Sequence, residues 1–491
     1  MLKKAISFIL IFVIVLLSLV GCGDDDVDAC IYVDLSDTPK TLDAQTAESD
    51  SELLVVRNIY EGLLRKNEDG KIVNGVCESY KKDGNTYTFK LKDNLKWSDG
   101  TALTADDFLF AFQRAVDPKT KAPFVRRLFS IKGAEEIYNS RAQLSELGVK
   151  TNGKYTLIID LKYDDKYFKE TLTGSICMPC NRSFFEDTTG KYGLKSEYVL
   201  SNGSYELNRW NKEDFNIRLY TNENYKGKFT PKNGSVYITC RSKESTAELL
   251  DDKKVDIAFV NNTAVDDLTD DITVKTYQNI CWVLHISEEY DEDIRKALAM
   301  LISDRGYSDK LDRGYKVANS IYPSVLNVSG ASGEGIKDYN IEAARDLFTD
   351  AVKQYEDKKL PSTMLYYYDN GLIKPVVTAI VGHWQQKLSA FVNIKSASSV
   401  DALTQDIEGN EISFAIYPVS ARSSSVDEYL RNFGTVWNGE NEVEIQRQIL
   451  AKDTMIPIAF ENINIGYTEL ITGFVSDPFN GYIDFAFITK K

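Results

Sequence analysis

Histidine is nearly absent from this chain: the 491 residues include only His285 and His383. Each lies in an apolar run, where a histidine is more often a packed residue than a base or a metal ligand. A Ser-His-Asp triad or a Cys-His dyad would need one of these histidines, and neither is accompanied by a recognisable catalytic motif. Phosphate loops, dinucleotide fingerprints and HExxH motifs are also missing. We therefore expect no enzyme, no cofactor and no metal site, and an extracellular hydrolase is the alternative that these absences disfavour.

Cysteine is sparse and irregularly spaced. Besides Cys22, the chain contains Cys30, Cys77, Cys177, Cys180, Cys240 and Cys281, which do not form a dense disulfide framework. The Cys177-Met-Pro-Cys180 pair lacks the second pair or the nearby histidine of a zinc site. It also lacks the strand-to-helix setting of a redox motif. Two alternatives remain for this pair, free buried thiols or one local disulfide.

Long hydrophobic runs are absent except at the N-terminus. Lys3 and Lys4 precede an apolar run from Ala5 to Val20, which is typical of a secretion signal. A retained transmembrane helix is the alternative. However, the run ends in Leu19-Val-Gly-Cys22, which resembles the bacterial lipoprotein box, so we expect cleavage before Cys22 and lipidation of that cysteine. Gly23-Asp-Asp-Asp26 would then be a solvated tether that holds a soluble body at the outer side of the cell membrane.

The remaining composition limits the partners and the architecture. The net charge is −15 with both signs interspersed, so nucleic acid is not an expected partner. The chain is too long for one core, and two or three domains are expected. Aromatic residues make up 11% of the chain, which is generous for a core alone and useful for lining a large cavity.

Local patterns predict mixed strands and helices. Residues 87–91 alternate apolar and polar side chains as a half-buried strand does. Thr104-x-x-Asp107 is a capping box for a helix that must end before Pro118. Apolar residues at helical spacing predict further helices from about Glu292, after the N-cap candidate Asn340, and over residues 377–388. Internal repeats and long linkers are missing, so the domains should be wound together.

A series of short motifs, in order, resembles one family along most of the chain. They are Thr41-Leu-Asp43, Tyr60-Glu-Gly-Leu-Leu64, Asp69-Gly70, Tyr87-Thr-Phe-Lys-Leu91, Trp97-Ser-Asp-Gly-Thr101, Leu103-Thr-Ala-Asp-Asp-Phe108, Gln113-Arg114, Asp117-Pro118, Ser201-Asn-Gly-Ser-Tyr205, Asn222-Glu-Asn-Tyr225, Ile294-Arg-Lys-Ala-Leu298 and Ile456-Pro-Ile458. This succession is similar to the oligopeptide-binding lipoproteins of ABC importers, the solute-binding proteins of family 5.

The resemblance implies an α/β fold of the type II periplasmic-binding-protein kind. Two α/β lobes would enclose an interlobe ligand cleft, with an extra subdomain on lobe one. The expected division is signal peptide 1–21, lipid-anchored acidic tether 22–30, lobe one 31–59, extra subdomain 60–182, lobe one again 183–277, lobe two 278–461 and the C-terminal part of lobe one 462–491. The lobes would close over the ligand by a hinge.

The resemblance also implies where a ligand would bind in lobe one. Family members grip an extended peptide mainly through its backbone. The first contact segment corresponds to Ala47, Glu48, Ser49 and Asp50, and Glu48 matches an acidic residue of the family. Phe124 stands where peptide binders have a tyrosine, so the aromatic ring is kept and the hydroxyl is lost. Core packing is the alternative reading of Phe124.

The second lobe departs from the family pattern. Tyr417-Pro-Val-Ser-Ala-Arg-Ser-Ser-Ser-Val426 corresponds to the segment that carries a pocket tryptophan and an aspartate for the peptide ammonium. Val419 aligns with the tryptophan and Arg422 with the aspartate, and Tyr417 and Ser420 would also contact ligand. An arginine there would repel an α-ammonium.

The implied function is a lipid-anchored receptor for peptides or peptide-like solutes. It would act as a monomer and deliver its ligand to the permease and ATPase subunits of an ABC importer. One alternative is a receptor for N-blocked, anionic or non-peptide solutes, in which Arg422 meets an anion. Another is a surface lipoprotein that senses peptides without a transporter.

Overall fold

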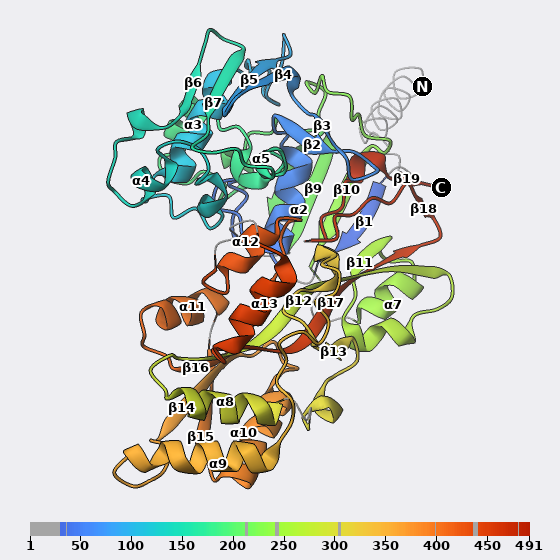
Figure 1. Cartoon of the computed structure of the whole chain (residues 1–491). Helices are drawn as coiled ribbons and strands as arrows, with labels where there is room; N and C mark the ends of the chain where they lie inside the picture. The colour runs from blue at the N-terminus through green and yellow to red at the C-terminus, as the bar shows by residue number, and fades with distance from the viewer. Residues whose placement is uncertain are drawn as a thin grey trace, which may run out of the picture.

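The computed structural model describes residues 30–35, 37–211, 215–240, 245–302, 306–397, 399–435, 440–479 and 481–491. The predicted signal peptide, Cys22 and most of the predicted tether lie outside the described residues. Figure 1 shows two α/β lobes and a separate block, the subdomain, beside the upper lobe. The expected fold class is thus confirmed.

One mixed sheet runs through both lobes in the order β15-β14-β16-β12-β17-β11-β1-β10-β9-β8, and β13 pairs with β17. In that order the strands are Val392–Ala397, Thr363–Tyr368, Phe414–Ser420, Ile272–Ile286, Met455–Thr468, Ile257–Phe259, Cys30–Asp34, Ser235–Thr239, Asn216–Thr221 and Tyr205–Asn211, and β13 is Tyr315–Val317. The first three belong to lobe two and the last five to lobe one. The long antiparallel strands β12 and β17 cross between the lobes.

The pairing of these crossing strands is interrupted where the lobes meet. Gln278 pairs with Asn462 and Ile280 with Glu461, so Asn279 is an extra residue in a β-bulge. Asn279 is buried, its side chain donates to the Phe479 carbonyl, and its carbonyl accepts from the Ala421 amide. The predicted lobe boundaries, 277/278 and 461/462, fall at this bulge.

The subdomain is built on its own sheet in the order β4-β5-β7-β6, with the hairpin β2-β3 beside it. The strands are β4 Cys77–Asp83, β5 Thr86–Leu91, β7 Thr156–Asp160, β6 Val149–Thr151, β2 Leu64–Lys66 and β3 Ile72–Asn74, and the helices are α3 Ala105–Val116, α4 Ala134–Tyr138, α5 Phe168–Thr171 and α6 Arg182–Asp187. Its buried residues form one continuous hydrophobic cluster with those of lobe one. Subdomain and lobe one therefore pack on a shared core and form one half of the molecule.

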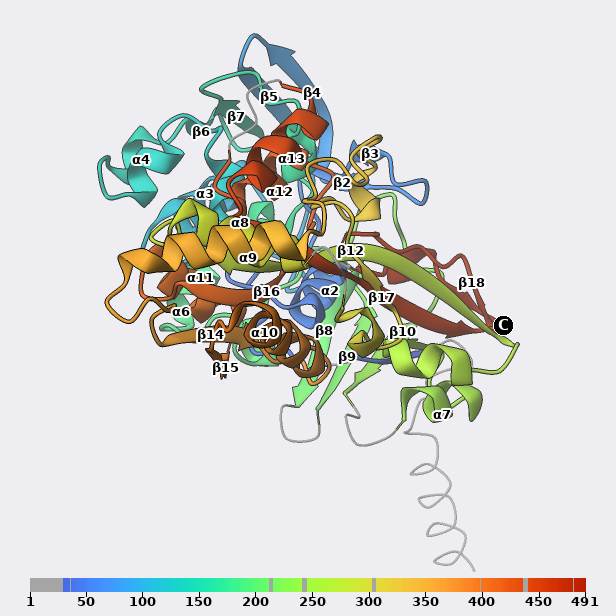
Figure 2. The ribbon, with the colours of Figure 1, turned by 60° about the horizontal axis from the view of Figure 1, so that its bottom comes forward.

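Lobe two has separate hydrophobic clusters on the two faces of its strands. Helices α8 Glu292–Ile302, α9 Ile341–Ala351 and α10 Lys374–Leu388 cover one face, which Figure 2 brings forward. Helices α11 Val400–Glu408, α12 Val426–Arg431 and α13 Glu442–Ala451 cover the other face and lie nearer the subdomain. Lobe one carries α2 Asp50–Ile59 and α7 Thr246–Asp251, and the short strands β18 Ile471–Thr472 and β19 Thr489–Lys490 form a ribbon near the C-terminus.

The predicted elements are confirmed where local sequence determined them. In α3, the Thr104 amide donates to the Asp107 carboxylate at 2.7 Å, and the helix ends before Pro118. The Asn340 side chain accepts from the Ala343 amide at the start of α9. Strand β5 contains the alternating segment 87–91, and helices α8 and α10 cover the other two predicted segments.

Candidate ligand-binding cleft

A cleft with a volume of about 920 Å³ lies between lobe two and the half formed by lobe one and the subdomain. Lobe two contributes the end of β16, the loop that follows it, and α12. The opposite wall includes Glu48 and Arg57 of lobe one and Phe124 and Glu170 of the subdomain. A molecule held here would contact both halves. The space is large enough for a ligand of drug size or larger.

Most of the predicted ligand-binding residues line this cleft: Glu48, Phe124, Tyr417, Val419, Ser420 and Arg422. The other three lie beside the wall without lining it. Ala47 is fully buried, Ser49 is the N-cap of α2, and Asp50 contacts Arg422.

Strand alternation places the lobe-two residues. Phe414 and Ile416 of β16 belong to the cluster under α8, α9 and α10, whereas Ala415, Tyr417 and Val419 belong to the cluster under α11, α12 and α13. Successive side chains of a strand point to opposite faces. Tyr417 and Val419 are therefore both on the cleft side of lobe two.

Glu52 positions the lobe-one contact segment, and the sequence analysis missed it. Its carboxylate accepts from the backbone amides of Lys40, Thr41, Glu48 and Ser49 at 2.8–3.2 Å, and its side chain is buried. The Ser49 hydroxyl accepts from the Glu52 amide in return, which completes a capping box. The Ser-x-x-Glu spacing of residues 49–52 is a sequence signal that could have revealed this role.

Arg422 crosses the cleft and contacts lobe one. Its guanidinium lies 3.3 Å from the Asp50 carboxylate and donates to the Glu48 carbonyl at 3.5 Å. The Arg422 side chain is 32% exposed and the Asp50 side chain is 42% exposed. Water therefore screens this ion pair, and it contributes about 1 kcal/mol or less to stability. Arg422 thus has an acidic neighbour from the opposite half.

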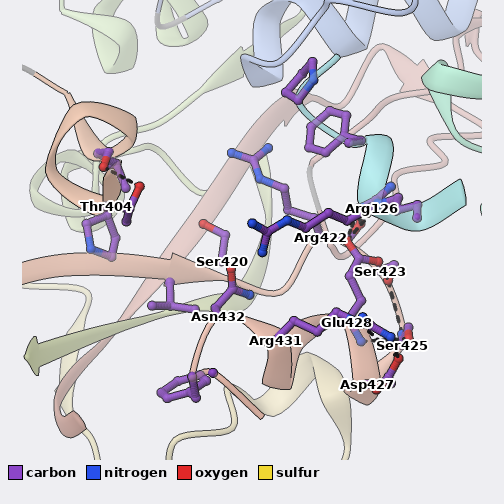
Figure 3. A pocket seen from close by; sticks show the side chains of 18 of the residues that line it. Arg126, Thr404, Ser420, Arg422, Ser423, Ser425, Asp427, Glu428, Arg431 and Asn432 are labelled. Atoms are coloured by element: carbon purple, nitrogen blue, oxygen red, sulfur yellow. Dashed lines mark hydrogen bonds and ion pairs between the residues drawn. The ribbon is translucent and has the colours of Figure 1, made fainter. Parts of the chain in front are cut away.

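The serine-rich loop after β16 is ordered by its own side chains. Figure 3 shows Ser423 and Ser425 turned toward Glu428 on α12. The Ser423 hydroxyl donates to the Glu428 carboxylate at 2.6 Å, and the Ser425 hydroxyl accepts from the Glu428 amide as the N-cap of α12. This arrangement fixes both the start of the helix and the direction of the glutamate.

Two further contacts join this loop to the subdomain. Arg127 donates to the Glu428 carboxylate at 2.7 Å, and the arginine side chain is only 10% exposed. The Ser424 amide and hydroxyl both donate to the Glu170 carboxylate. Together with the Arg422–Asp50 pair and the exposed Arg126–Glu408 pair at 3.8 Å, these contacts join the two halves across the cleft.

Phe124 lies at the boundary between the core and the cleft. It packs against the shared core of lobe one and the subdomain, and it lines the cleft. The Arg127 guanidinium lies 4.8 Å from its ring centroid and that of Arg422 lies 5.8 Å away. The ring therefore holds cations from both halves by its face.

His285 lines the lobe-two part of the cleft. Burial lowers the pKa of its imidazole to about 4, although the charge of Glu288 acts in the opposite direction. The side chain is therefore neutral at physiological pH, with one ring nitrogen able to donate a hydrogen bond and the other able to accept one.

The six cysteines in the described part of the chain are free. Cys177 and Cys180 are both buried thiols, so of the two alternatives the structure has the free pair. Burial raises the pKa of Cys177 to about 12 and that of Cys180 to about 11, which makes them poor nucleophiles.

Among the described residues, no group of three or more histidine, cysteine, aspartate or glutamate side chains could hold a metal ion. In the same part of the chain, none of the helices combines the length and apolarity needed to cross a membrane.

Two α/β lobes joined by crossing strands around a shared cleft are the arrangement of the type II periplasmic-binding-protein fold. Solved structures agree. The pheromone receptor PrgZ aligns with a TM-score of 0.79 at 20% identity over 94% of this chain and 99% of that one. Listeria monocytogenes OppA bound to peptide aligns with a TM-score of 0.76 at 20% identity over 94% and 99% of the two chains.

The family follows from sequence. The model of the bacterial extracellular solute-binding proteins, family 5 Middle, matches residues 71–441, and the chain belongs to this family. The oligopeptide-binding protein OppA of Bacillus subtilis is 25% identical over 80% of this chain and 78% of its own length. A dipeptide-binding protein of Lactococcus lactis is 32% identical, but the match spans 43% of this chain and only 39% of that protein.

Proposed function

We propose that this protein captures peptides or peptide-like solutes in the interlobe cleft and delivers them to the permease and ATPase subunits of an ABC importer. The observation that carries the proposal is the cleft itself, which is lined by both halves and spanned by side-chain contacts between them. Relatives whose names describe oligopeptide and dipeptide binding support peptides as the ligand class.

Capture would proceed by hinge closure. The bulge at Asn279, where β12 and β17 change register, is the hinge in this proposal, and the lobes divide there at 277/278 and 461/462. Lobe one and the subdomain move together because they share a hydrophobic core, and the loop after β16 closes against them. Lipidation of Cys22 would hold the monomeric receptor at the extracellular face of the cell membrane. At least two acyl chains would be needed for stable anchoring.

The ligand's N-terminus would not meet an acid at Arg422. Because Arg422 contacts Asp50, the local charge is already balanced, and blocking the α-amine should cost little. A second candidate, a receptor for N-blocked or anionic solutes, is favoured by the same arginine. A peptide sensor without a transporter is the third possibility, and permease and ATPase genes beside this one would argue against it.

The test uses the body from residue 30 onward, unfolded and refolded to remove carried-over ligand. Random short peptides and their N-acetylated counterparts are offered separately, and retained species are measured by native mass spectrometry and calorimetry. We expect both pools to bind, with dissociation constants that differ by no more than about threefold. Such a difference is well below the tenfold change that 1.4 kcal/mol of binding free energy produces. Retention of neither pool would refute the peptide function. A large loss on acetylation would refute the role given to Arg422.

A further inference from the structure

A second cavity shares part of its wall with the main cleft. This cavity, with a volume of about 350 Å³, is bordered by the β2-β3 hairpin, by residues 475–479 and by Tyr482 and Asp484. Arg57, Lys66, Glu170, Thr173 and Asp477 line both spaces. Ser424, which donates to Glu170, lines the second space, so the Ser424–Glu170 contact lies beside the residues that the two spaces share, a region called the passage below.

Most of the cations at this passage are well paired. The Lys66 ammonium lies 3.2 Å from Glu170 and 3.0 Å from Asp477. Arg65, on the second cavity, contacts both Glu61 and Asp484. These side chains therefore have their acceptors within the protein.

Arg57 is the exception. Its side chain is only 12% exposed, and its nearest acidic contact is Asp477 at 4.0 Å, beyond hydrogen-bond distance. Its Nε–H is buried and has no acceptor among the described residues, and the guanidinium lies 5.3 Å from the Tyr482 ring centroid. Burial lowers the pKa of Arg57, Asp477 opposes this shift, and the positive charge of Arg127 adds to it.

A buried guanidinium with an unused donor favours an anion that can accept from it. An unsatisfied buried donor is costly, and hydrogen bonds between arginine and carboxylate are among the strongest in proteins. Arg57 lines both the main cleft and the second cavity, so an anionic group of a ligand in either space would lie beside its side chain.

We propose that the passage is a subsite for a carboxylate of the bound ligand, with Arg57 as its partner and the second cavity holding the adjoining part of the ligand. This inference rests on the proposed peptide function. The carboxylate could be a side chain or the C-terminus of a peptide, because both present the same acceptor.

The test compares four versions of one short peptide, with either Glu or Gln at one position and either a free or an amidated C-terminus. Calorimetry gives the affinity of each for the wild-type protein, Arg57→Met and Arg182→Met. The last is a control of equal charge change on an exposed subdomain arginine outside both cavities.

We expect the wild-type protein to bind a carboxylate-bearing version about tenfold more tightly than the neutral one, as one charge-assisted hydrogen bond would give. Arg57→Met should remove this preference and retain binding of the neutral peptide, and Arg182→Met should keep the preference. If amidation weakens binding, the C-terminal carboxylate occupies the subsite. If the change from Glu to Gln weakens binding, the side-chain carboxylate occupies it.

Persistence of the preference in Arg57→Met, or its absence in the wild-type protein, would overturn the subsite while leaving peptide binding intact. Failure of every version to bind would refute the proposed function and the subsite together. If Arg57→Met does not fold, the Asp477→Asn variant provides the test. The Asp477 carboxylate would compete with the ligand for Arg57, so its removal should increase the preference for the carboxylate-bearing peptide. An unchanged or smaller preference in that variant would contradict the proposal.

Discussion

At the scale of single residues, the cleft contains a titratable group that the protein keeps uncharged. His285 is on β12, where Met455 and Ala415 are its strand neighbours, and burial lowers the pKa of its imidazole to about 4. In the unfolded chain the pKa would be about 6.5. The unfolded state therefore binds a proton at mildly acidic pH that the folded state does not.

His285 should make the protein less stable in acid. Because the folded pKa is the lower one, the free energy of unfolding should fall as pH decreases from about 6.5 toward 4, by roughly 1–2 kcal/mol between pH 7 and pH 5. Urea unfolding at both pH values measures this loss, which His285→Gln should reduce and the control His383→Gln should retain. Equal acid sensitivity of the wild-type protein and His285→Gln would contradict the prediction.

At the scale of elements, the start of α2 builds the lobe-one wall of the cleft. The four amides held by Glu52 belong to segments before and at the helix start. One buried carboxylate therefore fixes the chain path that presents Glu48 to the cleft and Asp50 to Arg422.

Replacing Glu52 should lower the free energy of unfolding more than removing the Ser49 cap of α2. Glu52→Gln loses the charge and replaces one acceptor oxygen by a donor, so we expect about 2–4 kcal/mol of lost stability. Ser49→Ala removes one capping contact and should cost about 1 kcal/mol. Chemical denaturation of both variants gives the comparison, and a Glu52→Gln effect no larger than that of Ser49→Ala would show that the carboxylate does not organise this segment.

At the scale of the whole molecule, ion pairs and hydrogen bonds connect lobe two with lobe one and the subdomain across the cleft. The Arg127–Glu428 pair is the best shielded of them, since its arginine is 10% exposed and its glutamate 31%. Together, contacts of this size contribute a few kcal/mol. The free-energy difference between two conformations of a protein is commonly of the same size.

Removing the Glu428 carboxylate should open the ligand-free protein. Glu428→Gln loses the ion pair with Arg127 and weakens the hold of Ser423, so we expect a larger radius of gyration by small-angle scattering. Saturating ligand should restore the compact form. The control Glu444→Gln changes the same charge on an exposed pair within α13 and should leave the radius unchanged, and an unchanged radius in Glu428→Gln would refute this role for the pair.

Much of this fold could be predicted because local sequence and motif order determine it. The helix starts at Thr104 and Asn340 and the end before Pro118 depend on residues a few positions apart. The interlobe pairs could not be predicted in this way, because Arg422 and Asp50 are 372 positions apart and Ser424 and Glu170 are 254 apart. Alignment placed Arg422 at the cleft, but its acidic neighbour follows only from how the two halves meet.

The place of β17 in the sheet has a consequence for how the chain folds during synthesis. This strand, residues 455–468, pairs with β12 on one side and with β11 on the other, and so joins the strands of the two lobes. Until it emerges from the ribosome, each lobe has an unpaired central edge, and such edges are prone to wrong pairing and aggregation. A nascent chain that stops short of β17 therefore exposes the edges of β11 and β12, and we expect wrong strand pairing during synthesis to occur there.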